Sequence, residues 1–95
     1  MMNRELLIDR ALKHDDKACV ELGNRYYIGD HEFDMNINNA IFWWRQAAEL
    51  NNVEAQYSLG IFYYNKCEDQ SRYWWDKASN NLKKERRTIN ESRSN

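Results

Sequence analysis

Apolar residues recur along this chain at the spacing expected for α-helices. Between residues 3 and 13, Leu6, Leu7, Ala11 and Leu12 follow a helical period while charged residues fill the other positions. Four later segments are also rich in apolar residues. The pattern predicts five helices, over residues 3–13, 17–28, 40–49, 53–65 and 72–79. The chain has no proline and only three glycines, which argues against an all-β fold of many tight turns and favours an all-α fold.

Polar residues next to these segments supply helix start and stop signals. Side chains that can cap a helix N-terminus are Asn3 for the first helix, Asp15 or Asp16 for the second, Asn36, Asn38 or Asn39 for the third, and Asp69 or Ser71 for the fifth. Gly29 is expected to end the second helix in a left-handed conformation. The connections are short, so consecutive helices are expected to be antiparallel neighbours.

Two parts of the chain repeat. Residues 16–27, D-K-A-C-V-E-L-G-N-R-Y-Y, match residues 53–64, V-E-A-Q-Y-S-L-G-I-F-Y-Y, at an offset of 37. Residues 42–47, F-W-W-R-Q-A, match residues 73–78, Y-W-W-D-K-A, at an offset of 31. Self-similarity on this scale is typical of stacked helix pairs, each too small to bury its own apolar face. Gly23 and Gly60 lie mid-helix, where a residue without a side chain is expected to let a neighbouring helix approach closely.

The two units resemble Sel1-like repeats, which are relatives of the tetratricopeptide repeat. The residues that carry the resemblance are Ala18, Leu22, Gly23 and Tyr26 with Ala40, Trp43, Ala47 and Ala48, then Ala55, Leu59, Gly60 and Tyr63 with Trp74 and Ala78. The chain departs from the family pattern at Asp16 and Val53, which replace alanine, and at Asn51 and Asn80, which replace glycine.

The resemblance implies a short right-handed α-solenoid of antiparallel helix pairs. Residues 1–81 then form one Sel1-like repeat domain, with an N-terminal capping helix (1–15), repeat 1 (16–52) and repeat 2 (53–81). Residues 82–95 form a basic polar tail, which is either a polar capping helix or disordered. The resemblance also implies a role in binding other proteins and no shared catalytic residue. It places Trp43 and Trp74 in the core and leaves Trp44 and Trp75 to be exposed or to pack on the neighbouring pair.

Charge is unevenly distributed although the net charge is only −1. The segment 82–95 holds five basic and two acidic residues, so residues 1–81 hold nine basic and thirteen acidic ones. An acidic body favours a basic protein partner and disfavours nucleic acid. The apolar run at Leu6, Leu7 and Ile8 is too short for a signal peptide or a membrane span, so we expect a cytoplasmic protein that does not bind membranes.

Candidate chemistry is sparse. Residues 30–36 alternate oxygen-bearing side chains like a calcium loop, but Met35 replaces the required glycine and Ile41 the required glutamate, so we expect no metal there. Cys19 and Cys67 form no zinc motif and are expected to be buried or half-buried free thiols. No cofactor and no small-molecule substrate is inferred. A hydrolase that uses one of these cysteines with His14 or His31 stays open as an alternative.

The function that this sequence predicts best is a non-enzymatic protein-interaction module with one main, basic partner. Its sharpest version is an immunity protein or inhibitor that neutralises a toxin such as a nuclease, and its rival is a scaffold adaptor in a larger complex. The predicted contact surface is the inner groove along residues 16–28 and 53–65, flanked by an acidic loop of residues 30–34. Its candidate residues are Glu21, Asn24, Arg25, Tyr27, Asp30, Glu32, Asp34, Gln56, Tyr57, Ile61 and Tyr64.

Overall fold

The computed structural model describes the backbone of residues 4–93 and the side chains of residues 4–84. The described residues form five helices and no strand, which confirms the all-α prediction. The helices are α1 Arg4–Leu12, α2 Asp16–Ile28, α3 Ile37–Glu49, α4 Val53–Tyr63 and α5 Glu68–Arg93. The predicted cap Asn3 lies outside the described residues. None of the helices in the described part combines the length and the apolar character that crossing a membrane requires.

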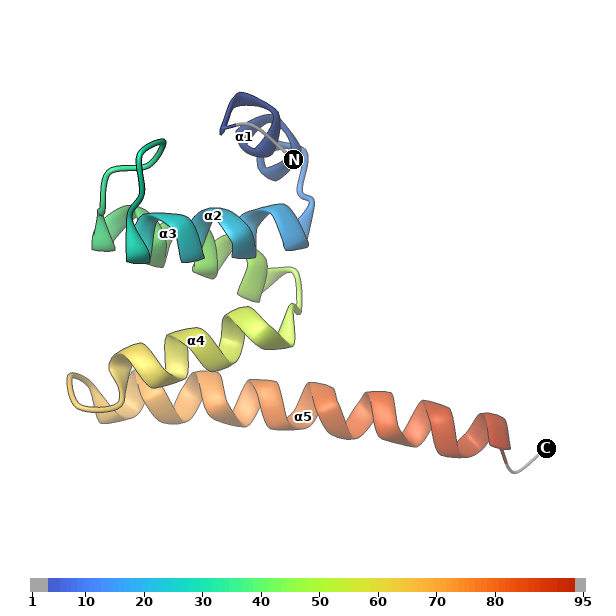
Figure 1. Cartoon of the computed structure of the whole chain (residues 1–95). Helices are drawn as coiled ribbons and strands as arrows, with labels where there is room; N and C mark the ends of the chain where they lie inside the picture. The colour runs from blue at the N-terminus through green and yellow to red at the C-terminus, as the bar shows by residue number, and fades with distance from the viewer. Residues whose placement is uncertain (1–3, 94–95) are drawn as a thin grey trace.

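The helices stack in chain order. The most extensive contacts join α2 to α3 and α4 to α5, and further contacts join α1 to α2 and α3 to α4. Figure 1 shows α1 at one end of the stack, α2 beside α3 in the middle, and α4 with α5 at the other end. Leu7 and Ala11 of α1 are buried, and α1 packs against α2.

Three asparagine and aspartate side chains begin the middle helices. Asp15 caps α2, with its Oδ1 accepting the backbone N–H groups of Lys17 and Ala18 at 3.1 and 3.2 Å. The hydrogen bond from the Ala18 N–H, then that from Arg10, lowers the pKa of Asp15. Asn36 and Asn52 cap α3 and α4 in the same way. Of the alternatives in the sequence, Asp15 and Asn36 are therefore the caps.

Residues with a positive φ end helices α2 and α3. Gly29 ends α2 with a positive φ of 79°, as predicted, although its ψ of 143° lies outside the left-handed helical region. Asn51 takes φ 66° in the turn between α3 and α4, a conformation that asparagine tolerates better than most residues. The side chain of Asn52 also donates to Asp16 Oδ2 at 2.8 Å, which ties the start of α4 to the start of α2.

The prediction for the fifth helix was wrong in its bounds. It begins at Glu68, so neither Asp69 nor Ser71 is its cap, and it runs past residue 79 to Arg93. The Ser71 hydroxyl instead donates to the Gly60 carbonyl at 2.9 Å. The apolar period stops near residue 80, but the lysines, arginines and glutamates that follow are good helix formers and sustain the backbone helix.

Each mid-helix glycine faces an indole ring, and the predicted close approach is confirmed. A Cβ atom on Gly23 would lie 2.2 Å from Trp44 Cδ1, and one on Gly60 would lie 2.2 Å from Trp75 Cδ1. Trp44 is 5% exposed, so the expectation that it could face solvent is wrong. It packs against Gly23 and Tyr27 of α2, within its own helix pair. Trp43 is only partly buried, while Trp74 is buried as expected.

One large core residue comes from a loop. Phe33, in the segment between α2 and α3, is 1% exposed and packs edge-on against Tyr26 with ring centroids 5.2 Å apart. The guanidinium groups of Arg4 and Arg25 lie 5.5 and 5.3 Å from the centre of its ring. The acidic loop is therefore anchored to α1 and to the first helix pair through Phe33.

The two buried tryptophans give a testable contrast. Trp44 Nε1 donates to Asn24 Oδ1 at 3.1 Å, whereas Trp74 Nε1 is buried without a hydrogen-bond partner in the described part of the chain. Trp44→Phe removes a hydrogen bond as well as apolar area, while Trp74→Phe removes an unsatisfied donor. We expect Trp44→Phe to lower the free energy of unfolding by about 1 kcal/mol more than Trp74→Phe in urea denaturation. Equal losses would contradict this assignment of hydrogen bonds.

Candidate functional site

A groove of about 290 Å³ lies between the two helix pairs, and we call it the α2/α4 groove. It is lined by Tyr27 of α2, Trp44 of α3, Ser58, Ile61 and Phe62 of α4, and Lys66 from the turn after α4. The structure thus brings together Tyr27 and Ile61, two residues of the predicted contact surface that are 34 positions apart in the chain.

The side chains on the groove are apolar yet accessible. Ile61 is 66% exposed and Tyr27 is 44% exposed, although the Tyr27 ring packs against Trp44 with centroids 5.3 Å apart. The Trp44 indole is held by its hydrogen bond to Asn24 and by the absence of a side chain on Gly23. The floor of the groove is therefore fixed by core packing, while its rim stays open to a partner.

Among the residues whose side chains are described, Lys66 is the cation that lines the groove. The Nζ of Lys66 lies 4.6 Å from the centre of the Phe62 ring and donates to the Phe62 carbonyl at 3.4 Å. This ammonium group gives the apolar groove one polar edge at the end where α4 meets the turn to α5.

The acidic residues predicted to flank the surface gather around Arg25. Its guanidinium lies 3.6 Å from Glu32, 3.8 Å from Asp30 and 4.0 Å from Glu21. Asp30 Oδ1 also accepts the backbone N–H groups of Glu32 and Phe33, and these two bonds lower the pKa of Asp30. One arginine cannot balance three carboxylates, so this cluster keeps a net negative charge, and Asp34 adds a further exposed carboxylate.

The acidic loop and the α4–α5 turn lie at the same end of the helices. In Figure 1 the segment between α2 and α3 and the turn between α4 and α5 project from the same end of the helices. Two residues of the groove are close to these segments in the chain. Tyr27 lies at the C-terminal end of α2, next to the α2–α3 loop, and Lys66 lies in the α4–α5 turn. The acidic loop and the turn that supplies Lys66 to the groove therefore lie at the same end of the helices, and no residue of the loop lines the groove.

Gln56 does not belong to the contact surface. It is 0% exposed, its Nε2 donates to the Ala48 carbonyl at 3.0 Å, and its Oε1 accepts from Asn81 Nδ2 at 3.0 Å. The prediction that Gln56 contacts a partner is wrong because its side chain joins α3, α4 and α5 inside the stack. Of the remaining predicted residues, Tyr57 is exposed on α4 and Tyr64 lines a separate pocket with Trp75.

Four groove residues were missing from the predicted set: Trp44, Ser58, Phe62 and Lys66. Trp44 could have been found from the helical period, since it lies four residues after Ala40 and three before Ala47, both buried. Phe62 belongs to the apolar run of the fourth helix. Lys66 carries no sequence signal, because its position depends on how the α4–α5 turn folds back.

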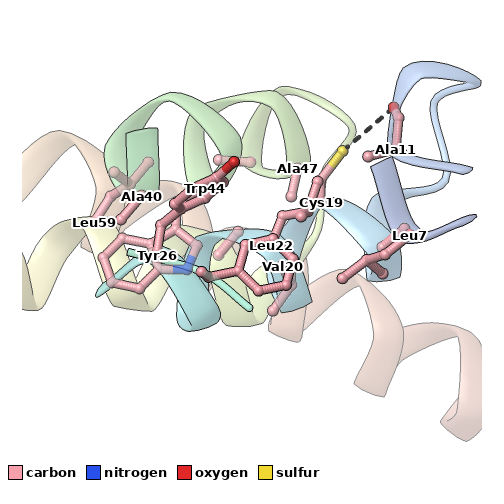
Figure 2. Packing of buried hydrophobic residues seen from close by; sticks show 14 of the residues in the cluster. Leu7, Ala11, Cys19, Val20, Leu22, Tyr26, Ala40, Trp44, Ala47 and Leu59 are labelled. Atoms are coloured by element: carbon pink, nitrogen blue, oxygen red, sulfur yellow. Dashed lines mark hydrogen bonds between the residues drawn. The ribbon is translucent and has the colours of Figure 1, made fainter. Parts of the chain in front are cut away.

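Cys19 is buried as expected, whereas Cys67 is exposed at the start of α5, contrary to the prediction. The Cys19 thiol donates to the Ala11 carbonyl at 3.6 Å, as the dashed line in Figure 2 shows. Burial, followed by the charges of Asp15 and Asp16, raises the pKa of this thiol. Cys19 and His14 do line one small pocket of about 110 Å³, but a raised pKa disfavours the thiolate that nucleophilic catalysis needs. Within the described residues, no three His, Cys, Asp or Glu side chains are placed to hold a metal ion.

Comparisons with known proteins identify one partial similarity. No protein-family model and no solved structure matches the chain. Over 90 residues the chain is 34% identical to the chitin synthase regulator SKT5 of Saccharomyces cerevisiae. The match covers 88% of this chain but 13% of that protein, so the chain corresponds to a small part of the regulator.

Proposed function

We propose that this chain is a non-enzymatic protein-interaction module built from two Sel1-like units in a short right-handed α-solenoid. What supports the repeat assignment is that each unit uses the same internal contacts. Gly23 with Trp44 and Gly60 with Trp75 have nearly identical geometry, and the Tyr27–Trp44 and Tyr64–Trp75 rings tilt by 37° and 39°. We expect the two units to act by binding through the exposed surface of the helix stack, and not through a catalytic residue that both units share.

The observation that carries the proposal is the α2/α4 groove. An apolar side chain of a partner can enter it and cover Ile61 and Tyr27, which removes exposed apolar surface from water. Tyrosine and tryptophan in a well-packed pocket that excludes water are among the residues most enriched in binding hot spots. Because Trp44 is already held in place by Asn24, little ordering is needed when the partner binds.

The acidic loop at the Lys66 end of the helices supports a basic partner. The carboxylates around Arg25 outnumber its charge, and they are exposed to solvent. Such a cluster attracts lysines and arginines on an approaching protein and raises the association rate more than the final affinity. Binding to a basic partner in the cytoplasm should therefore weaken as ionic strength increases.

The similarity to part of a chitin synthase regulator favours a regulatory adaptor over a toxin inhibitor among the binding functions. A regulator acts on another protein, which agrees with a module that binds through a groove. Both versions require one-to-one contact with a partner, and they differ in whether that partner is one subunit of an assembly or a free toxin. A hydrolase is the less favoured alternative, because the pKa of the buried Cys19 thiol is raised.

Affinity capture from the native host tests this function. The bait is the full chain, used at low and at high salt beside an Ile61→Asp variant, and bound proteins are identified by mass spectrometry. We expect the full chain to retain a basic protein, with less retained at high salt and much less retained by Ile61→Asp, since a carboxylate would be placed against the apolar groove. Several subunits of one complex would indicate an adaptor, and one small basic protein an inhibitor target. Equal retention by both baits would contradict the groove as the binding site.

A further inference from the structure

A second pocket repeats the construction of the α2/α4 groove at the end of the stack. Tyr64, which directly follows α4, and Trp75 of α5 face it with ring centroids 5.5 Å apart, compared with 5.3 Å for Tyr27 and Trp44. These residues are counterparts in the internal repeat, at the offsets of 37 and 31. The pocket encloses about 430 Å³.

The two pockets differ in what closes them. In the α2/α4 groove, Ser58, Ile61 and Phe62 of the following helix form the opposite wall. The second pocket is built on α5, which lies at the end of the stack opposite α1 in Figure 1. The described chain therefore supplies no helix in the position that α4 occupies relative to α3.

The lining of the second pocket is more polar and carries a net negative charge. Arg72 pairs with Glu68 at 2.8 Å, which leaves the exposed carboxylate of Asp76 beside the Trp75 ring. In the first groove the same aromatic pair is accompanied by a cation, Lys66. An aromatic pair next to a carboxylate is suited to a lysine or an arginine supplied from outside.

We propose that the pocket formed by Tyr64, Glu68, Arg72, Trp75 and Asp76 docks an amphipathic helix of a partner protein that carries one basic side chain at the contact. The helix occupies the position on α5 that α4 occupies on α3, with an aliphatic side chain on Trp75 and a basic side chain near Asp76. The spacing of Ser58, Ile61 and Phe62 on α4, and of Lys66 in the turn that follows it, gives the pattern that such a helix carries. The proposal rests on the internal repeat and stands apart from the α2/α4 groove.

Nuclear magnetic resonance can test it with a defined probe. The probe is a side-chain-stapled helical peptide with the chain's own residues 53–66, because an unstapled peptide of this length forms little helix in water. The four tryptophans give four indole N–H signals in the ¹⁵N-labelled protein, and single Trp→Phe variants assign them. We expect the Trp75 signal to shift and saturate as peptide is added, while the Trp44 signal stays in place.

Charge reversal on both sides of the contact completes the test. Asp76→Lys in the protein, or Lys66→Glu in the peptide, should each weaken binding about fivefold, the size expected for an exposed ion pair beside an aromatic ring. The matched control is Arg45→Glu, which reverses the exposed charge at the equivalent position of α3 and should leave the affinity unchanged. The proposal is overturned if millimolar peptide leaves the Trp75 signal unmoved or if Asp76→Lys binds as well as the unmodified chain. A Trp75 shift that depends on protein concentration alone would also overturn it, since a second copy would then be the occupant.

Discussion

Replacing Gly23 by alanine should lower the free energy of unfolding by about 2 kcal/mol, although alanine is the better helix former. The added Cβ would meet Trp44 Cδ1 at 2.2 Å, Nε1 at 2.4 Å and Cγ at 2.9 Å. The indole is buried and bonded to Asn24, so it cannot swing aside without breaking that bond. For a domain of this size, such a loss lowers the melting temperature by about 10 °C. Urea denaturation followed by far-ultraviolet circular dichroism measures it.

Gly60→Ala should cost less than Gly23→Ala, although the overlap is equally close. Its Cβ would lie 2.2 Å from Trp75 Cδ1, but Trp75 is only half-buried and can move outward. In a Trp75→Leu background the overlap with the indole disappears, and Gly60→Ala should then stabilise the chain by about 0.5–1 kcal/mol through helix propensity alone. The same destabilisation in both backgrounds would show that the indole is not what requires a glycine.

Replacing Gln56 by alanine should lower the free energy of unfolding by about 2–3 kcal/mol. The side chain is fully buried, donates to the Ala48 carbonyl of α3 and accepts from Asn81 of α5. Alanine removes both bonds and leaves a cavity where three helices meet. Chemical denaturation of Gln56→Ala measures the loss. The control is Asn38→Ala, a change at an exposed residue of α3, whose free energy of unfolding should stay within about 0.5 kcal/mol of that of the unchanged chain.

Gln56→Glu adds a pH signature to the same position. An ionised carboxylate cannot donate to the Ala48 carbonyl, whereas the protonated acid can. Burial raises the folded-state pKa of such a carboxyl above its unfolded value of about 4.3. Relative to Gln56→Ala, the variant should therefore be most stable below about pH 4 and lose stability as the pH rises. A difference between the two variants that does not change with pH would contradict the burial of this side chain.

Repeat matching located the close contacts of Gly23 and Gly60 from the sequence, because both glycines interrupt otherwise favourable helices at equivalent positions. For the first helix pair, however, the resemblance placed Trp43 in the core, whereas the structure buries Trp44. Helical spacing from Ala40 and Ala47 places Trp44 on the face that packs against α2, about 100° from Trp43. Counting the period of each helix separately would have corrected the choice that the resemblance suggested.

The positions of Phe33, Gln56 and Lys66 depend on tertiary contacts, which the periodic pattern of apolar residues does not indicate. Phe33 is buried because the loop folds back, with Asp30 accepting two backbone N–H groups and Asn36 N–H donating to the Tyr26 carbonyl. Gln56 is a polar residue on a buried face, and only its partners on α3 and α5 make that burial possible. The groove itself requires Lys66 from a turn, which a prediction limited to the helices could not include.

The central claim is that the α2/α4 groove binds a protein partner, and the dissociation constant of the captured partner tests it most directly. The comparison needs Ile61→Asp and, as a matched control, Phe42→Asp, which places the same charge at an exposed apolar residue of α3 outside the groove. We predict that Ile61→Asp weakens binding at least about tenfold, while Phe42→Asp stays within about twofold of the unchanged chain. Equal affinities for Ile61→Asp and the unchanged chain, with both folded by circular dichroism, would contradict the claim.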